Sequence, residues 1–300
     1  MRILLTGASG QVGGALLPLL RARGDDVLTP RRDQFNLADP AALRAWLEAW
    51  RPDLIVNPAA YTAVDRAEDE TALAYRVNAE SPAVIAGWAA SHQVPLLHFS
   101  TDYVYDGSGE APWREDSPVG PLSAYGASKL AGDQAIAAAG GPHLILRTCW
   151  VYAATGSNFL RTIVRLARER PELRIVADQI GAPTSARAIA AAAASLLPDT
   201  AAELAARLAR DGGVVHVACA GATSWHGFAE AIVTGLRARG ATLAVERIVP
   251  IGTADFPTKA KRPGNSRLDL SRLNGVFGIP TPSWQEALEV ELDALVREVG

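Results

Sequence analysis

Short apolar runs alternate with longer amphipathic stretches along the first half of the chain. The runs are bounded by turn residues and read RILLTG, DVLTP, DLIVNPA, PLLHFST and HLILRTC. Runs that are apolar throughout are typical of strands buried on both faces of a parallel sheet. The stretches at residues 39–50 and 82–92 have the spacing of helices. Strands and helices in this order predict βαβ crossovers and an α/β fold with a doubly wound parallel sheet.

Two prolines bear on the predicted helices. Asp39 precedes Pro40, and together they form an N-cap followed by proline at the first helical position. Pro18 falls inside the first predicted helix. Because proline removes a backbone donor there, we expect that helix to bend or to be shortened.

The alternation loosens in the second half of the chain. SNFLRTIVRLARER has the pattern of an amphipathic helix, LRIVADQ of a strand, TSARAIAAAAASLL of a helix, and VVHVACAG of an apolar strand that can return to the sheet. Beyond Thr223 we expect two more helices, a strand at residues 245–249 and a proline-rich loop containing KRPGNSRLD. We interpret this half as a smaller domain that covers a cleft and is partly interleaved with the first. The expected boundaries are residues 1–151 with about 184–221 for the first domain, and about 152–183 with 222–300 for the second.

Composition excludes some classes of protein. The chain has 300 residues, 49% of them apolar and 20% charged, as in ordinary soluble globular proteins. A net charge of −3 gives no electrostatic reason to expect nucleic acid, which usually binds a basic face. The sequence starts MRILLTG, without the regions of a secretory signal, and its most apolar later run, AIAAAAASLL, is short for a bilayer span. We therefore expect a cytoplasmic protein that binds neither nucleic acid nor membrane.

The first strand runs directly into TGASGQVGGALL, a glycine-rich turn that leads into a helix. Gly7 permits a tight turn, Gly10 lets backbone amides approach a pyrophosphate, and Gly13 lets the helix pack close to the sheet. The helix N-terminus then offers free N–H groups and a partial positive charge to the phosphates. A glycine trio alone is a weak signal, but its place between strand one and helix one predicts a Rossmann-type dinucleotide-binding domain.

The residues after the second strand indicate which dinucleotide is bound. An acidic side chain usually binds the adenosine 2′-hydroxyl at this point, whereas the segment VLTPRRDQF has Arg31 and Arg32 there. Guanidinium groups favour a 2′-phosphate, so NADPH is expected, with NADH as the alternative. The two arginines can also be ordinary polar residues of a loop. Asn36 and Leu37 are expected to flank the adenine.

Small and polar side chains follow the next two strands, at the sheet edge where open α/β folds bind ligands. Ala59 and Ala60 leave room there for a ribose and a nicotinamide. Thr101, between Ser100 and Asp102, offers a hydroxyl that can hold a substrate carbonyl. The same Ser-Thr-Asp cluster also suits a turn or a cap.

The segment AYGASK places Tyr125 and Lys129 four residues apart, on one face of a predicted helix. A free tyrosine has a pKa of about 10, too high for ready proton exchange at neutral pH. A lysine ammonium and an oxidised nicotinamide nearby would lower the pKa of the phenol, and a fall of about three units corresponds to about 4 kcal/mol. The pair fits a proton donor and a cation that lowers the pKa of that donor, with the Thr101 hydroxyl as the partner of the phenol.

These motifs together resemble the extended short-chain dehydrogenase/reductase superfamily, and more closely the dTDP-4-dehydrorhamnose reductase family. The resemblance covers nearly the whole chain and is carried by TGASGQVG, NPAAYTAVDRAED, STDYVYDG, PLSAYGASKLAGD, LRTCWVYA, NFLRTIVRLARER, DQIGAPTSA, TSWHGFAEAI and RPGNSRLD. The glycine loop, the STD strand end and the Tyr125–Lys129 pair mark only the superfamily. The patterns DQxGxPT and RPxNSRLD are selective for the reductase family.

The resemblance implies that NAD(P)H reduces the 4-keto group of dTDP-4-dehydro-β-L-rhamnose to give dTDP-β-L-rhamnose, the last step of dTDP-L-rhamnose biosynthesis. Tyr125 would donate the proton, and Thr101 would bind the reacting oxygen. Lys129 would lower the pKa of Tyr125 and hold the nicotinamide ribose. The implied cofactor-binding residues are Gly7, Gly10, Gln11, Val12, Gly13, Arg31, Arg32, Asn36, Leu37, Ala59, Ala60, Tyr61, Phe99, Tyr125 and Lys129. The residues implied for the dTDP-sugar are Val64, Asp65, Thr101, Asp102, Trp150, Arg262, Asn265 and Arg267.

One set of positions departs from the family. Some members form a metal-linked dimer through a glutamate of the first helix and acids of the second domain, whereas this chain has Ala15, Arg187 and Gln285 at the aligned positions. Loss of three oxygen ligands removes a magnesium site. We therefore expect no bound metal, no metal dependence, and a monomer or a weak homodimer.

Two alternatives stay open. Another NDP-4-keto-deoxysugar reductase, a 4,6-dehydratase or a 4-epimerase would share many of these motifs, and an epimerase would turn over without consuming reductant. A non-catalytic protein, of the type of the regulatory subunit of methionine adenosyltransferase, resembles the same family. The presence of Tyr125, Lys129 and Thr101 favours an enzyme, although similarity of fold alone does not establish function.

Overall fold

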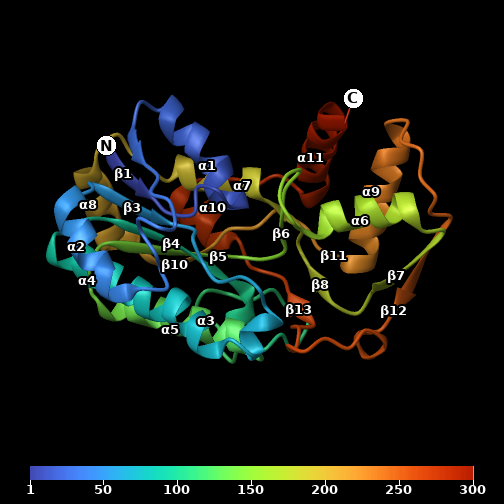
Figure 1. The fold of residues 1–300 in the computed structure, drawn as a ribbon, viewed down its shortest axis with the longest axis horizontal. Coiled ribbons are helices and arrows are strands. Elements are labelled where there is room, and N and C mark those ends of the chain that lie inside the picture. Colours follow the sequence, from blue (N-terminus) through green and yellow to red (C-terminus); the bar gives the residue numbers. More distant parts are fainter. Residues whose placement is uncertain (300) are drawn as a thin grey trace.

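The structure, a computed structural model, describes residues 1–299. Figure 1 shows a larger lobe built on a six-stranded sheet and a smaller lobe that contains α6, α9, β7 and β12. The helices are α1 (Gln11–Ala22), α2 (Pro40–Trp50), α3 (Thr71–Tyr75), α4 (Ser81–Ser91), α5 (Ala124–Ala138), α6 (Phe159–Glu169), α7 (Ala186–Ser195), α8 (Ala201–Asp211), α9 (Trp225–Ala238), α10 (Ser271–Phe277) and α11 (Trp284–Val299), with short η1 (Arg66–Glu68), η2 (Arg76–Glu80), η3 (Asp102–Val104) and η4 (Thr253–Asp255). The strands are β1 (Arg2–Leu5), β2 (Asp26–Leu28), β3 (Leu54–Asn57), β4 (Leu96–Thr101), β5 (His143–Thr148), β6 (Val151–Tyr152), β7 (Glu172–Val176), β8 (Ile180–Gly181), β9 (Thr184–Ser185), β10 (Gly213–His216), β11 (Thr223–Ser224), β12 (Arg247–Ile251) and β13 (Asn265–Ser266).

The larger lobe is organised by one parallel sheet in the order β10-β5-β4-β3-β1-β2. Strand β1 pairs with β2 on one side and with β3 on the other. The strand order therefore reverses at β1, and the carboxyl ends of β1 and β3 flank the topological switch point where open α/β sheets bind ligands. At the far edge β10 pairs with β5, so the run VVHVACAG does return to the sheet. The doubly wound Rossmann-type fold predicted from the sequence is confirmed.

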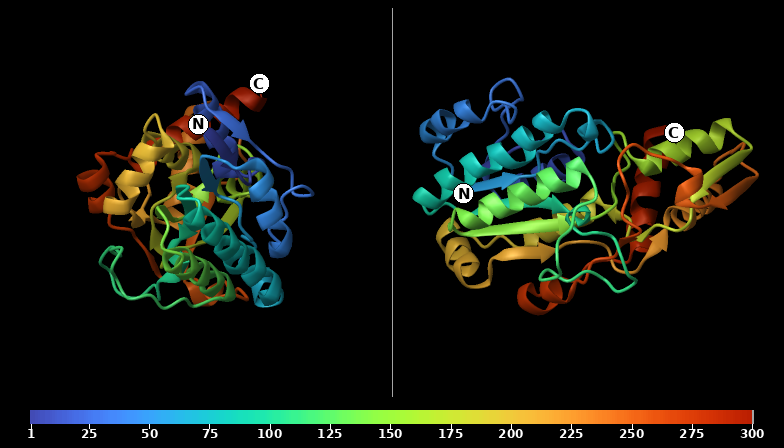
Figure 2. Two further views of the ribbon diagram at one scale, coloured as in Figure 1. Left: turned by 90° about the vertical axis from the view of Figure 1, so that its left-hand side faces the viewer. Right: turned by 90° about the horizontal axis from the view of Figure 1, so that it is seen from below.

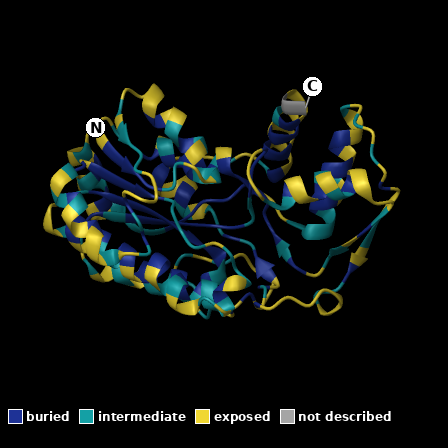
Figure 3. Ribbon diagram, viewed as in Figure 1, coloured by how far each residue is buried: buried dark blue, intermediate teal, exposed yellow. Residues whose placement is uncertain are grey.

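Helices cover both faces of this sheet. The side chains of β1 alternate, with Ile3 and Leu5 in the core beneath α1, α7 and α8, and Leu4 in the core beneath α2 and α4. In Figure 3 the central strands of this lobe are largely dark blue, and exposed positions lie on the outer sides of the helices. Burial on both faces explains why the strand sequences are apolar throughout.

The smaller lobe has a core of its own. Leu160 and Ile163 of α6, Phe228 and Ile232 of α9, and Leu292 of α11 are buried together. This lobe lies at one end of the elongated molecule (Figure 2, right). Between α6 and α9 the chain returns to the larger lobe, where α7 and α8 pack into the core of the six-stranded sheet. The two lobes are therefore interleaved in sequence.

The structure corrects several expected boundaries. The strand expected at residues 245–249 is β12 at Arg247–Ile251, because its register is set by pairing with β7. Helix α8 was not expected, and three helices instead of two follow Thr223, because the short α10 packs Leu273 and Phe277 into the core of the larger lobe. These segments depend on contacts with elements far away in the sequence.

The two prolines lie where the sequence placed them. Pro18 is inside α1, which is not shortened and continues to Ala22. Asp39 is the N-cap residue of α2 and Pro40 its first residue, although the Asp39 side chain makes no capping hydrogen bond. No helix within the described residues is long and apolar enough to cross a membrane.

Gly132 of α5 provides a test of helix packing. A Cβ at this position would lie 2.0 Å from the carbonyl oxygen of Asn78 in η2. We predict that Gly132→Ala lowers the free energy of unfolding by about 1–3 kcal/mol, the usual cost of overpacking. The matched control is Gly87 of α4, because a Cβ there meets nothing within 4 Å. Gly87→Ala should raise stability by up to about 1 kcal/mol, and urea unfolding that gave both variants the same sign would contradict this packing.

Candidate active site

The glycine-rich turn is shaped by backbone contacts that exclude side chains. Gly7 has a φ of 57°, in the left-handed region, and a Cβ there would lie 3.0 Å from the Cα of Ala59. A Cβ on Gly13 would lie 2.2 Å from the carbonyl oxygen of Gly7. Gly10 donates its N–H to that oxygen at 2.9 Å and begins α1 without a side-chain cap. The first N–H groups of α1 are therefore available to a phosphate.

The two arginines expected at an adenosine phosphate lie on the exposed loop after β2. The guanidinium of Arg31 donates two hydrogen bonds of 3.1 Å to the carboxylate of Asp33, and both side chains are largely exposed. Asn36 accepts a hydrogen bond from the N–H of the residue two positions later. Leu37 is buried in the core beneath α2 and α4. The loop thus presents positive charge, part of which is shared with Asp33.

Gln11 and Val12 form the first turn of α1. Val12 packs against the core of the larger lobe. The side-chain oxygen of Gln11 accepts a hydrogen bond of 2.9 Å from Nδ2 of Asn158, the N-cap residue of α6. The smaller lobe therefore reaches the glycine-rich turn directly.

Ala60 and Tyr61 follow β3, and the backbone of Tyr61 is anchored by Asn78, a residue that sequence reasoning missed. The N–H of Tyr61 donates to Asn78 Oδ1 at 2.8 Å, and its carbonyl accepts from Asn78 Nδ2 at 3.0 Å. The Tyr61 hydroxyl donates to Glu70 at 2.6 Å. Asn78 Nδ2 also donates to Ser128 of α5 at 3.0 Å, which ties the end of β3 to the helix of the tyrosine–lysine pair.

Tyr125 and Thr101 meet at the carboxyl end of β4. The hydroxyl of Ser123 caps α5 by accepting from the N–H of Gly126 at 3.2 Å, so Tyr125 lies in the first turn of the helix. Burial raises the pKa of Tyr125, and a hydrogen bond with Thr101 opposes that rise. The phenol is therefore neutral and already in contact with the hydroxyl expected to share its substrate oxygen.

Lys129 lies one helical turn beyond Tyr125 and points into the protein. Its Nζ donates to the carbonyl of Phe99 at 2.6 Å and lies 3.1 Å from Nε2 of His98. Burial lowers the pKa of Lys129 to about 8, against the raising effect of Asp133. The fall in the pKa of Tyr125 that the sequence suggested is absent in this structure. Desolvation of the phenol raises its pKa, the neighbouring Asp102, Tyr103 and Asp133 raise it further, and together they outweigh the hydrogen bond with Thr101.

Asp133 extends the same face of α5 by one more turn, and sequence reasoning missed it. Its buried carboxylate accepts from Ser100 Oγ at 2.9 Å and from Arg147 Nε at 3.0 Å. Arg147 in turn donates to the Tyr105 hydroxyl at 2.9 Å. The spacing Tyr-x-x-x-Lys-x-x-x-Asp, which continues the helical period, is the signal that could have found it.

Asp102 directly follows Thr101 and is 2% exposed. Its Oδ1 accepts a hydrogen bond of 3.2 Å from the Thr101 hydroxyl, whereas Oδ2 is buried without a partner. Burial raises the pKa of Asp102 to about 6, and the nearby hydroxyls of Ser266 and Thr101 oppose the rise. A buried carboxyl with one free oxygen can bind a ligand hydroxyl.

Asp65 and Arg262 come together from opposite halves of the chain. Arg262 Nη2 lies 2.6 Å from Asp65 Oδ2, and the N–H of Ala260 donates to Asp65 Oδ1 at 3.0 Å. Val64 precedes this pair and is half-buried. The charge of Arg262 acts on the phenol of Tyr103 and lowers its pKa against the larger rise caused by burial, and the Tyr103 ring packs edge-on against the Tyr125 ring. These substrate candidates therefore lie next to Tyr125, the expected proton donor.

The side chains of Asn265 and Arg267 donate hydrogen bonds to backbone carbonyls of the 108–111 loop. Asn265 Nδ2 donates to the carbonyls of Ser108 and Ala111 at 3.3 and 2.8 Å. Arg267 Nη1 donates to the carbonyl of Glu110 at 2.7 Å. In this structure both side chains hold the 108–111 loop in place.

Trp150 has an unusual backbone conformation for a tryptophan, with a φ of 47°. Its indole stacks on Trp225, with ring centroids 3.6 Å apart and an interplanar angle of 12°. Trp225 Nε1 donates to Gln179 Oε1 at 3.1 Å. A Cβ on Gly181 would lie 2.7 Å from the Trp150 ring. Gln179 and Gly181 of the DQIGAPT segment thus hold the stacked pair of indoles in place. Sequence reasoning missed Trp225, the second residue of this pair.

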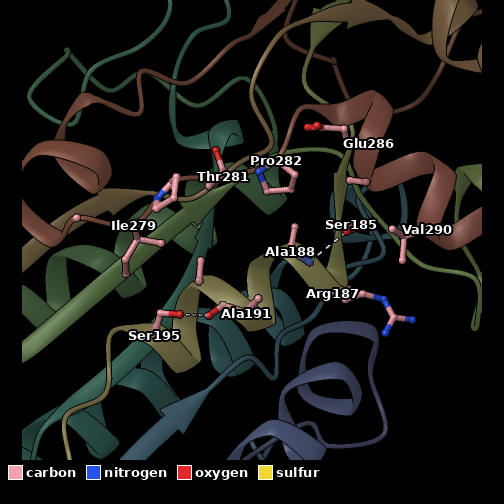
Figure 4. Close-up of a pocket in the computed structure, with 14 residues that line it drawn as sticks. Ser185, Arg187, Ala188, Ala191, Ser195, Ile279, Thr281, Pro282, Glu286 and Val290 are labelled. Carbon is pink, nitrogen blue, oxygen red and sulfur yellow. Dashed lines mark hydrogen bonds between the residues drawn. The ribbon is translucent and has the colours of Figure 1, made fainter.

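A pocket of about 470 Å³ lies between α7 and the segment that leads into α11 (Figure 4). Ala188 and Ala191 line it from α7, and Ile279 and Pro282 line it from the segment before α11. None of the residues expected to bind cofactor or sugar lines this pocket. It is therefore separate from the candidate active site.

The raised pKa of Asp102 should make stability depend on pH. The folded protein holds this proton up to about pH 6 and the unfolded chain only to about 3.8, so ionisation of Asp102 lowers stability as the pH rises between them. Asp102→Asn should therefore raise the free energy of unfolding by about 1–3 kcal/mol at about pH 7 and change it little at about pH 4. Urea unfolding at both pH values measures this, and an equal change at both would contradict it.

Comparison with known proteins identifies the family. The family model for the RmlD substrate binding domain matches residues 1–297. A dTDP-4-dehydrorhamnose reductase of Burkholderia thailandensis is 50% identical over 292 residues, which cover 96% of this chain and 97% of that protein. The solved dTDP-4-dehydrorhamnose reductase of Clostridium acetobutylicum has 34% identity and a TM-score of 0.89, covering 99% of this chain and 100% of its own. That of Bacillus anthracis, solved in complex with NADP, has 32% identity and a TM-score of 0.86, covering 98% and 99%. This chain, with its glycine-rich turn and its Tyr125–Thr101 contact at one edge of the sheet, belongs to the RmlD family of dTDP-4-dehydrorhamnose reductases.

Proposed function

We propose that this chain reduces dTDP-4-dehydro-β-L-rhamnose to dTDP-β-L-rhamnose with NADPH, as the last step of dTDP-L-rhamnose biosynthesis. The observation that carries the proposal is the contact of Tyr125 with Thr101 at the end of β4. It lies at the same sheet edge as the turn in which Gly7 and Gly13 exclude side chains. A phenol and a hydroxyl at this place can both bind one ketone oxygen.

Three side chains, Tyr125, Thr101 and Lys129, have separate roles in the reduction of the ketone. A bound nicotinamide supplies the hydride. Tyr125 donates its proton to the C4 oxygen as negative charge develops there, and its raised pKa keeps the phenol protonated at neutral pH. Thr101 hydrogen-bonds the same oxygen and fixes its position. Lys129 adds a buried positive charge one helical turn away.

A dinucleotide fits the glycine-rich turn, because a Cβ at Gly13 would clash and the N–H groups of α1 have no side-chain cap. Arg31 and Arg32 would hold the 2′-phosphate of NADPH, a contact that NADH lacks. The Bacillus anthracis relative was solved with NADP. Ala59, Ala60 and Tyr61 would line the ribose and the nicotinamide.

The dTDP-sugar would lie against both lobes. Trp150, stacked on Trp225, presents an apolar face to the sugar, and Asp102 has a free buried oxygen for a sugar hydroxyl. The residues proposed to contact the dTDP-sugar are Val64, Asp65, Thr101, Asp102, Trp150 and Arg262. Asn265 and Arg267 would act by holding the 108–111 loop, since their polar groups bond its carbonyls.

We also propose that residues 1–151 with about 184–221 bind the dinucleotide, and that about 152–183 with 222–300 bind the sugar. The packing of α7 and α8 into the core of the six-stranded sheet supports this division. Helix α10 is an exception within the second part, because it also packs into that core.

The tyrosine gives the sharpest test of this function. The keto-sugar is generated from dTDP-glucose by the upstream dehydratase and epimerase, and oxidation of NADPH and of NADH is followed separately, with the lower KM expected for NADPH. Tyr125→Phe should lower kcat by about 10²–10⁴-fold while NADPH binding is retained. Tyr75→Phe on α3, outside the proposed site, is the control and should keep full activity. Binding of NADPH without any oxidation by the unchanged protein would favour an epimerase or a regulatory subunit.

We propose that the enzyme needs no divalent metal and is a monomer or a weak homodimer. Arg187 pairs with the buried Glu291 at 3.2 Å, so this position carries a positive charge where a metal would need an acid. Within the part of the chain that the structure describes, no group of three acidic, histidine or cysteine side chains could hold a metal ion. EDTA should therefore leave NADPH oxidation and the sedimentation coefficient unchanged. Loss of activity or dissociation of a dimer on chelation would contradict the proposal.

A further inference from the structure

A chain of buried polar side chains runs from Lys129 to the glycine-rich turn. Lys129 Nζ lies 3.1 Å from Nε2 of His98, and His98 Nδ1 lies 3.0 Å from Nδ2 of Asn57. The Thr6 hydroxyl donates to Asn57 Oδ1 at 2.6 Å. All four side chains are at most 3% exposed. The reduction described above uses Lys129 and gives the other three no part.

The ring of His98 is neutral. Complete burial and the neighbouring lysine lower the pKa of His98 well below its usual range. A neutral imidazole has one nitrogen that donates a hydrogen bond and one that accepts. The partners on its two sides, Lys129 and Asn57, therefore determine which nitrogen carries the proton.

This row of polar side chains can form its hydrogen bonds with either protonation state of Lys129. With Asn57 Nδ2 facing Nδ1 of His98, as in the structure, Nδ1 accepts and Nε2–H donates to a neutral lysine amine. If the Asn57 amide turns by half a rotation, its oxygen accepts from Nδ1–H and Nε2 accepts from an ammonium. Asn57 Nδ2 then donates to the Thr6 hydroxyl, which in the first arrangement is the donor. Each of these three contacts then pairs a donor with an acceptor in both arrangements.

We propose that His98, backed by Asn57 and Thr6, is the positioning residue that holds Lys129 in one place in both its charged and its neutral form. The role rests on the reductase function proposed above. His98 acts through the lysine. The Phe99 carbonyl accepts a hydrogen bond from Nζ at 2.6 Å. His98 and this carbonyl together bind two of the positions around Nζ. The remaining N–H of the ammonium is then directed to a ligand at the sheet edge.

The groups around Lys129 set the direction of the expected pH effect. The charge of Asp133 acts on it from α5, and His98 and the Phe99 carbonyl contact it from β4. A hydrogen bond from a charged donor is stronger than one between neutral groups, so His98 favours the ammonium. Loss of the ring should lower the pKa of Lys129. A carboxylate in place of the Asn57 amide should raise it, because it accepts from Nδ1–H and adds negative charge.

The test measures the pKa of Lys129 by NMR of its Nζ. The chain has three lysines, Lys129, Lys259 and Lys261, so ¹⁵N-lysine labelling gives few signals and Lys129→Arg assigns the buried one. His98→Phe should lower the pKa of Lys129 by about one to two units, and Asn57→Asp should raise it by about one unit. His98→Gln should restore most of the loss, because its amide oxygen can accept from Nζ. The alkaline limb of kcat/KM against pH should move in the same directions.

His216 provides the matched control. It is also a fully buried histidine bonded through both ring nitrogens, to the Tyr105 hydroxyl at 2.7 Å and to the Asp269 carbonyl at 3.1 Å. His216→Phe should lower stability and leave the pKa of Lys129 unchanged. Equal shifts in His98→Phe and His216→Phe, or shifts of one sign in His98→Phe and Asn57→Asp, would overturn the inference.

The two proposals can fail separately. If the unchanged protein oxidises no NADPH with the keto-sugar, the reductase function is wrong, but the NMR measurement on the ligand-free protein still tests the role of His98. If the protein is active and the pKa of Lys129 does not respond to His98, only the inference is wrong. If His98→Phe does not fold, His98→Gln is compared with Asn57→Asp instead. The pKa of Lys129 is then expected to be lower in His98→Gln than in Asn57→Asp.

Discussion

A positive charge has to be kept in the interior of this protein, one helical turn from Tyr125, the proposed proton donor. Removing an ammonium from water costs several kcal/mol unless partners replace the lost hydration. Lys129 receives them from the Phe99 carbonyl and from His98, and the field of Asp133 favours its charge. Asp133 is itself paired with Arg147. The polar interior behind the sheet edge is therefore organised around one amine.

This arrangement depends on the parallel sheet. Because the strands run in one direction, Thr6, Asn57 and His98 stand at or near the same edge although they are separated by about forty to fifty residues each. Helix α5 packs along β4, where Lys129 contacts Phe99 and Asp133 contacts Ser100. Ser128 is bonded to Asn78, and Gly132 packs closely on η2. Close backbone approach therefore fixes the position of the helix, and hydrogen bonds fix the face that carries Lys129.

Sequence patterns predicted what depends on local physics. The apolar runs gave the strands of the main sheet, and the Gly7–Gly13 turn and the one-turn spacing of Tyr125 and Lys129 follow from backbone geometry. The direction of a side chain was not accessible in the same way. Lys129 points to Phe99 and His98, and Asn265 is engaged by the 108–111 loop, because the partners come from distant parts of the chain. The register of β12 depends likewise on β7.

The contact of Gly181 with the Trp150 ring has a consequence for reading related sequences. The Trp150 ring, which stacks on Trp225, and the Cβ of Ser266 fill the space that a side chain at position 181 would need. A larger residue at 181 would therefore displace the Trp150 ring and disturb its stack on Trp225. A homologue that keeps Tyr125 and carries a larger residue at 181 would lack the stacked surface of Trp150 and Trp225. If Trp150 contacts the sugar as proposed above, such a homologue would have to recognise its sugar through other side chains.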